Sequence, residues 1–261
     1  MSSQTDVPPV SVFNQNGQAR LLLVCEHASN FIPARYENLQ LADGVLHSHA
    51  ALDIGAYDLA RAISRLLDAP LVSTTVSRLV YDCNRAFDAT GAIPEESEVF
   101  RIPGNQNLSD AEAMERFKNY YLPFEKTISD RLDQFTEPPL FVTIHSFTPV
   151  YHGETREVDI GIVCDQDSRL MDRMVQLAPQ RTELCVEPNQ PYGPEDGVTH
   201  TLSLHGKKNA LLNVMIEVKN DLLDSVEKCQ EMALTLATMI SRSATYFGYR
   251  IPLRSDHATN S

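Results

Sequence analysis

The 261-residue sequence has few basic residues: 22 Lys and Arg stand against 35 Asp and Glu, which gives a formal net charge of −13. Proteins that bind nucleic acid need a basic surface opposite the phosphates, so this balance argues against a nucleic acid partner. A small anionic substrate is still compatible with the sequence, because one arginine in a cleft can outweigh the global charge locally.

The chain also lacks long apolar runs and paired cysteines. No run approaches the roughly 20 apolar residues that span a bilayer, and residues 1–20 lack the basic and apolar regions of a signal peptide. The five cysteines are scattered and form no CxxC pair, which argues against a disulfide framework or a thiolate zinc cluster. These absences predict a cytoplasmic protein with no membrane partner and with reduced, buried thiols.

Short apolar runs alternate with longer segments of helical periodicity. The predicted buried strands cover residues 20–25, 70–76, 139–144, 158–164, 183–186 and 210–216. The predicted helices cover residues 51–67, 109–135, 168–177 and 222–247. This alternation predicts an α/β fold with three α/β/α layers around a mostly parallel, doubly wound sheet. We expect a single domain over residues 1–261, with residues 1–18 and 252–261 frayed.

Polar side chains follow several of the predicted strands, where ligands of open α/β sheets bind. Imidazole and carboxylate groups are the usual zinc ligands outside thiolate sites, and a further carboxylate can take a proton from metal-bound water. An arginine offers a planar fork to a substrate carboxylate. The residues at these positions are His27, Asp53, Arg78, Asp82, Asn84, Arg85, His145 and Glu217.

Each of these residues also has a purely structural interpretation. A single histidine after a buried strand is more often a hydrogen-bonded structural residue than a ligand. Asp53 would equally serve as a helix cap, Glu217 would equally pair with Lys219, and Asp82 would equally pair with Arg85. Their coincidence at equivalent strand ends favours a functional site.

Two long segments, residues 88–108 and 188–209, are rich in Gly, Pro, Asn and Asp. Loops of this length in a compact domain are usually functional or mobile. In the second, Tyr192–Gly193 and Thr199–His200 could line a pocket lid, but a solvated loop is the interpretation that we favour.

Five parts of the chain resemble the N-formylglutamate amidohydrolase family, and the resemblance extends from about Leu21 to Tyr249. They are His27 after the first strand, His49–Ala56, Ser77–Arg85, Thr143–Ser146 and Ile216–Leu222. The Asp-Cys-Asn-Arg segment at 82–85 and the Ile-Glu pair at 216–217 are the more specific pieces. The family is similar to the zinc carboxypeptidases and aspartoacylases, which implies a zinc-carboxypeptidase-like α/β/α fold with one catalytic Zn²⁺ per chain.

The resemblance also implies roles for individual residues. His27, Asp53 and His145 resemble the metal ligands, and Glu217 resembles the general base. The residues that resemble the binding site for a substrate carboxylate are Asn84 and Arg85, together with Arg78.

The third metal ligand has alternatives. The carboxypeptidase pattern has an acidic ligand three residues after the first histidine, where this chain has Asn30. Asp53 is similar in placement to the acidic ligand of zinc muramoyl amidases, and Glu26 is the reserve.

The function that the resemblance implies is zinc-dependent hydrolysis of the amide in a small anionic N-acyl amino acid such as N-formylglutamate. The first strand ends in Cys-Glu-His-Ala-Ser-Asn, where we expect Pro-His-Ser-Gly in true deformylases, so the acyl group and amino acid stay open. A metallopeptidase or cell-wall amidase with an open groove is one alternative. A non-catalytic small-molecule-binding relative without metal is another, and Asn30 points to it. The oligomeric state is not indicated.

Overall fold

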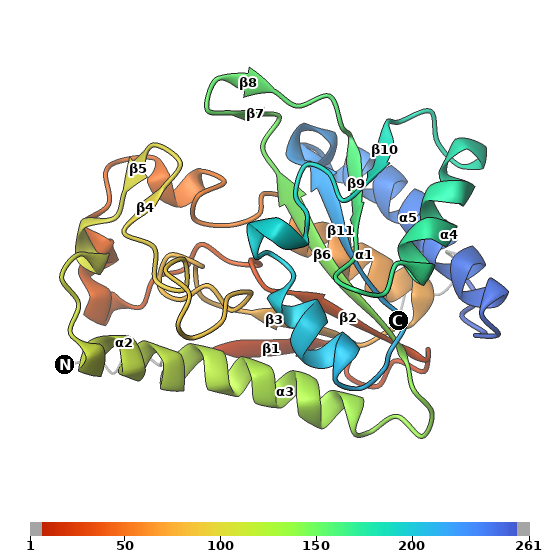
Figure 1. Ribbon diagram of the computed structural model, residues 1–261, viewed down its shortest axis with the longest axis horizontal. Coiled ribbons are helices and arrows are strands. Elements are labelled where there is room, and N and C mark those ends of the chain that lie inside the picture. Colours follow the sequence, from red (N-terminus) through yellow and green to blue (C-terminus); the bar gives the residue numbers. More distant parts are fainter. Residues whose placement is uncertain (1–6, 255–261) are drawn as a thin grey trace.

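The computed structural model describes residues 7–254, which build a seven-stranded sheet in the order β1-β3-β2-β6-β11-β9-β10 (Figure 1). Four of the six neighbouring pairs are parallel, and the β1–β3 and β11–β9 pairs are antiparallel. The predicted mostly parallel sheet is therefore confirmed. The strands are β1 (Val10–Phe13), β2 (Leu21–Cys25), β3 (Leu71–Thr74), β6 (Leu140–Phe147), β9 (Ile160–Val163), β10 (Val186–Pro188) and β11 (Asn213–Lys219).

Helices cover both faces of the sheet, as the three-layer prediction requires. Alternate residues of β2 enter two different cores: Leu21 and Leu23 pack on one face, and Leu22 and Val24 pack on the other. The first core includes α1 (Ala56–Leu67), α4 (Arg169–Leu177) and α5 (Val226–Tyr246), and the second includes α3 (Leu122–Leu132). Burial on both faces explains why the strand sequences are apolar without alternation.

Two of the predicted helices differ most from the structure. The segment 109–135 divides into α2 (Asp110–Arg116), a π-helical turn over Phe117–Tyr121, and α3. Pro123 has no N–H for a regular helical hydrogen bond, which accounts for the irregular turn before it. The segment 51–67 becomes helical only at Ala56, and the turn before it carries Asp53.

The strand limits also differ from the prediction. Strands β6 and β11 extend to Phe147 and Lys219. His145 and Glu217 therefore lie within these strands, near their carboxyl ends, and not after them. Residues 10–13, predicted to fray, form the edge strand β1 antiparallel to β3. An edge strand is only half-buried and gives a weak apolar signal. Residues 255–261 of the predicted C-terminal frayed segment lie outside the described residues.

Two hairpins extend from the end of the sheet that carries the strand carboxyl termini. The hairpin β4 (Glu96–Ser97) and β5 (Phe100–Arg101) follows β3 in the chain, and β7 (Val150–Tyr151) and β8 (Glu154–Thr155) continue directly beyond β6 (Figure 1). Within residues 7–254, no helix has the length and apolarity needed to cross a membrane. All five cysteines are free, and four of them are buried, but Cys185 is exposed, contrary to the prediction.

Gly161 in β9 lies where another segment of the backbone packs closely against the sheet. A Cβ atom there would lie 1.8 Å from the Gln190 carbonyl oxygen and 3.3 Å from the Glu217 Cβ atom. We therefore expect Gly161→Ala to lower the free energy of unfolding in urea by about 3 kcal/mol, because backbone must move to make room. Gly91→Ala is the matched control, since its new Cβ atom would meet nothing closer than 3.6 Å. Equal stability of the two variants would contradict this packing.

Candidate functional site

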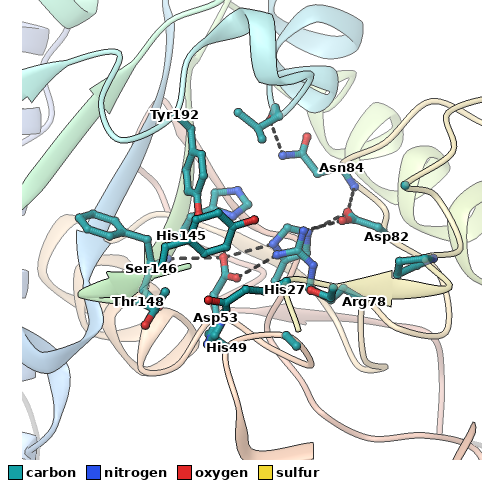
Figure 2. Close-up of a pocket in the computed structure, with 18 of the residues that line it drawn as sticks. His27, His49, Asp53, Arg78, Asp82, Asn84, His145, Ser146, Thr148 and Tyr192 are labelled. Carbon is teal, nitrogen blue, oxygen red and sulfur yellow. Dashed lines mark hydrogen bonds and ion pairs between the residues drawn. The ribbon is translucent and has the colours of Figure 1, made fainter. Parts of the chain in front are cut away.

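Three buried side chains meet at the carboxyl end of the sheet. His27 follows β2, Asp53 lies in the turn before α1, and His145 lies near the end of β6. One possible ligand atom of each residue lies within 4.8 Å of the other two. The Asp53 Oδ2 atom is 3.2 Å from His27 Nδ1 and 2.8 Å from His145 Nδ1 (Figure 2). The structure thus brings together the three residues assigned to the metal from the sequence, and their role as ligands stays a prediction.

Each histidine presents its other ring nitrogen to a further buried carboxylate. His27 Nε2 lies 2.8 Å from Asp82 Oδ1, and His145 Nε2 lies 3.0 Å from Glu26 Oε2. A metal-bound histidine almost always directs its outer N–H to a carboxylate or carbonyl group, which fixes the ring and makes the inner nitrogen a better ligand. The donor set therefore fits a divalent cation held by the two Nδ1 atoms and Asp53.

The alternatives for the third ligand occupy other positions. Glu26 lies at the outer nitrogen of His145, whereas Asp53 lies at the inner nitrogens of both histidines. The Asn30 Nδ2 atom donates a hydrogen bond of 2.8 Å to the Leu46 carbonyl oxygen. The geometry therefore favours Asp53 over Glu26 and Asn30.

The buried carboxylates make the centre electronegative. Burial by itself would raise the pKa of Asp53, but the His27 and His145 rings hold it below the usual range. Burial likewise opposes protonation of His145, yet Glu26 and Asp53 raise the pKa of its imidazole well above the ordinary value. The field that favours a proton on these rings also favours a metal cation between them.

Arg78 bridges two carboxylates of the centre. Its Nη2 atom lies 2.7 Å from Asp82 Oδ2, and its Nη1 atom lies 3.4 Å from Asp53 Oδ1. The Asp82–Arg85 ion pair considered from the sequence is not formed, because Asp82 pairs with Arg78 and His27. Arg78 lines the pocket as predicted, but its charge is balanced by its two partners, which favours a role in holding Asp82 against His27.

Glu217 is a buried carboxylate of the pocket that has a free oxygen. It lies in β11 in register with His145 and is 5% exposed, and its Oε2 atom makes no hydrogen bond within the described residues. Burial and the nearby Asp53 raise the pKa of Glu217 to about 7, against the opposing effect of His145. Lys219, its possible partner from the sequence, pairs instead with Asp159 at 2.7 Å. Such a carboxylate suits a general base.

Asn84 and Arg85 both hold the loop that follows β10. The Asn84 amide donates to the Val198 carbonyl oxygen and accepts a 3.0 Å hydrogen bond from the Thr201 N–H. The Arg85 Nη1 atom donates to the Asp196 carbonyl oxygen at 2.8 Å. Over residues 7–254, Arg85 forms no salt bridge. Arg85 thus has a free charge in the pocket, whereas the Asn84 side chain is engaged with backbone.

A pocket of about 280 Å³ opens over the His27–Asp53–His145 cluster and is lined by all of the residues predicted for the site. Several further lining residues were not predicted as site residues. They are His49, Glu98, Phe147, Thr148, Tyr151 and Tyr192. The solvated-loop interpretation of Tyr192 is wrong, since its side chain points into the pocket toward His145 (Figure 2). Glu98 and Tyr192 lie in the segments 88–108 and 188–209, whose length was the available signal. His49, Phe147, Thr148 and Tyr151 lie outside both segments.

Comparisons with known proteins find chains that are similar in sequence and in structure. A family model described as N-formylglutamate amidohydrolase matches residues 19–223. The crystal structure of a gene product from Agrobacterium tumefaciens is 44% identical, with a TM-score of 0.92 over 94% of this chain and 98% of that chain. The N-formylglutamate amidohydrolase from Ralstonia eutropha is 17% identical, with a TM-score of 0.66 over 92% and 98% of the two chains, and shares the fold. No curated protein sequence matches the chain.

We expect the purified protein to hold about one divalent metal ion per chain, measured by inductively coupled plasma mass spectrometry. Asp53→Asn should abolish metal retention, because both inner nitrogens face this carboxylate. Glu26→Gln is the matched control: it removes an equally buried carboxylate at the outer nitrogen of His145, and such a change weakens metal binding by only roughly 10- to 100-fold. Metal retention in Asp53→Asn together with its loss in Glu26→Gln would make Glu26 the ligand.

Proposed function

The chain belongs to the N-formylglutamate amidohydrolase family, and from this premise we propose that it is a zinc-dependent hydrolase of the amide bond in small anionic N-acyl amino acids such as N-formylglutamate. One observation carries the proposal: the free oxygen of buried Glu217 lies in the same pocket as the His27–Asp53–His145 cluster. We place the enzyme in the cytoplasm, where free thiols stay reduced.

Zinc is the ion that this donor set suits best. Two imidazole nitrogens and one carboxylate are a common protein ligand set of catalytic zinc, and they leave the fourth tetrahedral position open. When bound, zinc would supply Lewis acidity toward the acyl carbonyl group and lower the pKa of a water molecule. The ring orientations that such binding requires are maintained by Asp82 and Glu26, and Arg78 holds Asp82 in turn.

We assign both proton transfers of the reaction to Glu217. As a carboxylate it accepts a proton from the attacking water, and as a carboxylic acid it returns that proton to the leaving amine. Burial raises the pKa of Glu217, which favours the protonated form that the second transfer needs. The absence of a hydrogen-bond partner at its Oε2 atom leaves this oxygen available to water.

Arg85 is the residue that we assign to the α-carboxylate of the substrate. Its guanidinium group lines the pocket without an acidic partner among the described residues and is held in place by the Asp196 carbonyl oxygen. Asn84, predicted as a second donor, supports this arrangement by fixing residues 198–201 of the same loop. A clamp of this kind distinguishes free amino-acid carboxylates from peptides.

The dimensions and the completeness of the site favour this function over the two alternatives. A pocket of about 280 Å³ suits a small molecule better than a peptide or cell-wall strand, which needs an open groove. A non-catalytic relative would have no need for the intact His–Asp–His cluster beside a free, buried Glu217.

We predict that the zinc-loaded protein releases amine from at least one member of an N-acyl amino acid panel that includes N-formylglutamate. Glu217→Gln should lower this turnover by roughly 10²–10⁴, the usual contribution of a general acid–base group. Its zinc content should not change, because Glu217 lies outside the ligand cluster. Loss of zinc in the variant would make Glu217 a ligand, and absence of turnover over the whole panel would contradict the proposed function.

We also predict that Arg85→Lys weakens binding of substrates that have a free α-carboxylate, and of no others. Loss of a bidentate contact in a desolvated pocket should cost roughly 2–5 kcal/mol of binding. The measurement compares kcat/KM for an N-acyl amino acid with kcat/KM for its α-amide. Wild type should prefer the free acid, and Arg85→Lys should not distinguish the two substrates. Arg131→Lys is the matched control, because Arg131 also donates to a loop carbonyl oxygen, at 3.1 Å, but does not line the pocket. A wild-type enzyme with no preference for the free carboxylate would rule out the clamp.

A further inference from the structure

Two hairpins form part of the pocket wall, and the proposed reaction uses no residue of either. The pocket is lined by Glu96, Ser97 and Glu98 of the β4–β5 hairpin and by Tyr151 of the β7–β8 hairpin. Both hairpins lie beyond the carboxyl end of the sheet (Figure 1). Each strand of the two hairpins has only two residues. Isolated two-stranded hairpins are at best marginally stable in water, so contacts with other parts of the chain must hold them in place.

One carboxylate joins the two hairpins. Glu98 lies in the turn of the β4–β5 hairpin, and its Oε1 atom accepts a 2.8 Å hydrogen bond from the N–H of His152, in the turn of the β7–β8 hairpin. The Oε2 atom of Glu98 lies 2.8 Å from Nε2 of His49, in the segment before α1. Over residues 7–254, no other hydrogen bond connects the two hairpins. Glu98 thus joins three segments that are distant in the sequence.

The Glu98 side chain is directed inward. It is 11% exposed, whereas the neighbouring Val99 is 68% exposed. Phe100, in the same hairpin, also meets the His49 ring, with the ring centres 6.0 Å apart in an edge-on arrangement. A carboxylate that is largely withdrawn from water needs partners for its oxygens, and His49 and the His152 N–H are these partners. Separation of the hairpins therefore requires that water replace the His152 N–H at Glu98.

The backbone at this contact is strained on both sides. The φ angle is 54° at Glu98 and 49° at His152, in the left-handed region that Gly and Asn usually occupy in such turns. Strained backbone persists only where its surroundings maintain it, and it is frequent at ligand clamps and switch regions. Because Gly would fit the Glu98 position without strain, the side chain at this position must contribute something that Gly would not.

The contact lies beside the path to the proposed metal ligands. His27, Asp53 and His145 line the same pocket as Glu98, and each is at most 5% exposed. A ligand that reaches this cluster must pass the walls of the pocket, which the two hairpins help to form. Closure of such a wall excludes water from the reaction, and opening admits the substrate and releases the products.

We propose that Glu98 is a positioning residue that latches the two hairpins over the pocket, and that ligands enter and leave when this latch opens. This inference goes beyond the proposed function, because it concerns the opening of the pocket and not the reaction inside it. Loss of the latch should therefore accelerate the entry of a ligand. Removal of a side chain that only stabilises the fold, or that contacts the ligand directly, would not accelerate entry.

Hydrogen–deuterium exchange of the full-length protein, followed by mass spectrometry, tests the latch without any ligand. In Glu98→Ala, we expect segments 96–101 and 150–155 to exchange faster by roughly 2- to 10-fold, the effect of one ordinary hydrogen bond on an equilibrium constant. Glu98→Gln retains an acceptor oxygen for the His152 N–H, so its exchange should lie between the two. Glu96→Ala is the matched control, because Glu96 is an exposed carboxylate of the same hairpin that also lines the pocket. Its exchange should equal that of wild type.

Stopped-flow fluorescence measures the entry of a ligand. The chain has no tryptophan, so Tyr151 and Tyr192 in the pocket can report binding through tyrosine fluorescence. The ligand is N-formylglutamate, and the protein is zinc-loaded Glu217→Gln, which does not consume it. Adding Glu98→Ala should raise the association and dissociation rate constants by roughly 2- to 10-fold each. Adding Glu96→Ala should change neither rate constant.

Two outcomes would overturn the latch: unchanged exchange of segment 150–155 in Glu98→Ala, or an association rate constant that does not rise in this variant. If Glu98→Ala does not fold, the same two criteria apply to Glu98→Gln. Faster exchange of both hairpins in Glu98→Ala, in a protein that neither binds nor cleaves any N-acyl amino acid of the panel, would support the latch and reject the proposed function. Amine release by a protein whose association rate constant does not depend on Glu98 would do the reverse.

Discussion

Two imidazole rings and three carboxylates lie together at the end of the sheet, and the five residues that carry them are each at most 5% exposed. A buried charge without a partner costs several kcal/mol, so each group must be held against a partner of opposite charge. Asp53 satisfies both inner nitrogens, while Asp82 and Glu26 lie at the outer ones. This mutual compensation determines where the surrounding loops can lie, and it leaves a central position that suits a cation.

The three-layer fold supplies the rigidity that such an arrangement needs. Strands β2, β6 and β11 are consecutive parallel neighbours, and His27, His145 and Glu217 project from their carboxyl ends. Helices on both faces exclude water from the sheet, so the positions of these side chains follow from strand register. The loops contribute the remaining groups, and they are tied to each other by Asn84 and Arg85. Rigid strands thus hold the reactive groups, and loops shape the pocket.

Much of this arrangement could be predicted from the sequence, because continuous apolar runs locate the central strands and polar residues directly after them locate the site. His27 and His145 were found in this way. The edge strand β1 was missed because half-burial weakens its apolar signal. The ion pairs could not be predicted from the sequence. Asp82 pairs with Arg78 and not with Arg85, because the geometry of the turn determines which guanidinium group faces it. Tyr192 reaches the pocket only through tertiary packing.

X-ray absorption spectroscopy of the zinc-loaded protein shows whether His27, Asp53 and His145 together hold one metal ion. We expect a first shell of nitrogen and oxygen atoms only, at roughly 2.0–2.1 Å, with the multiple scattering of two imidazole rings. His145→Ala should reduce that scattering to one ring. Sulfur scattering at roughly 2.3 Å, or a wild-type spectrum with fewer than two imidazoles, would rule out this ligand set.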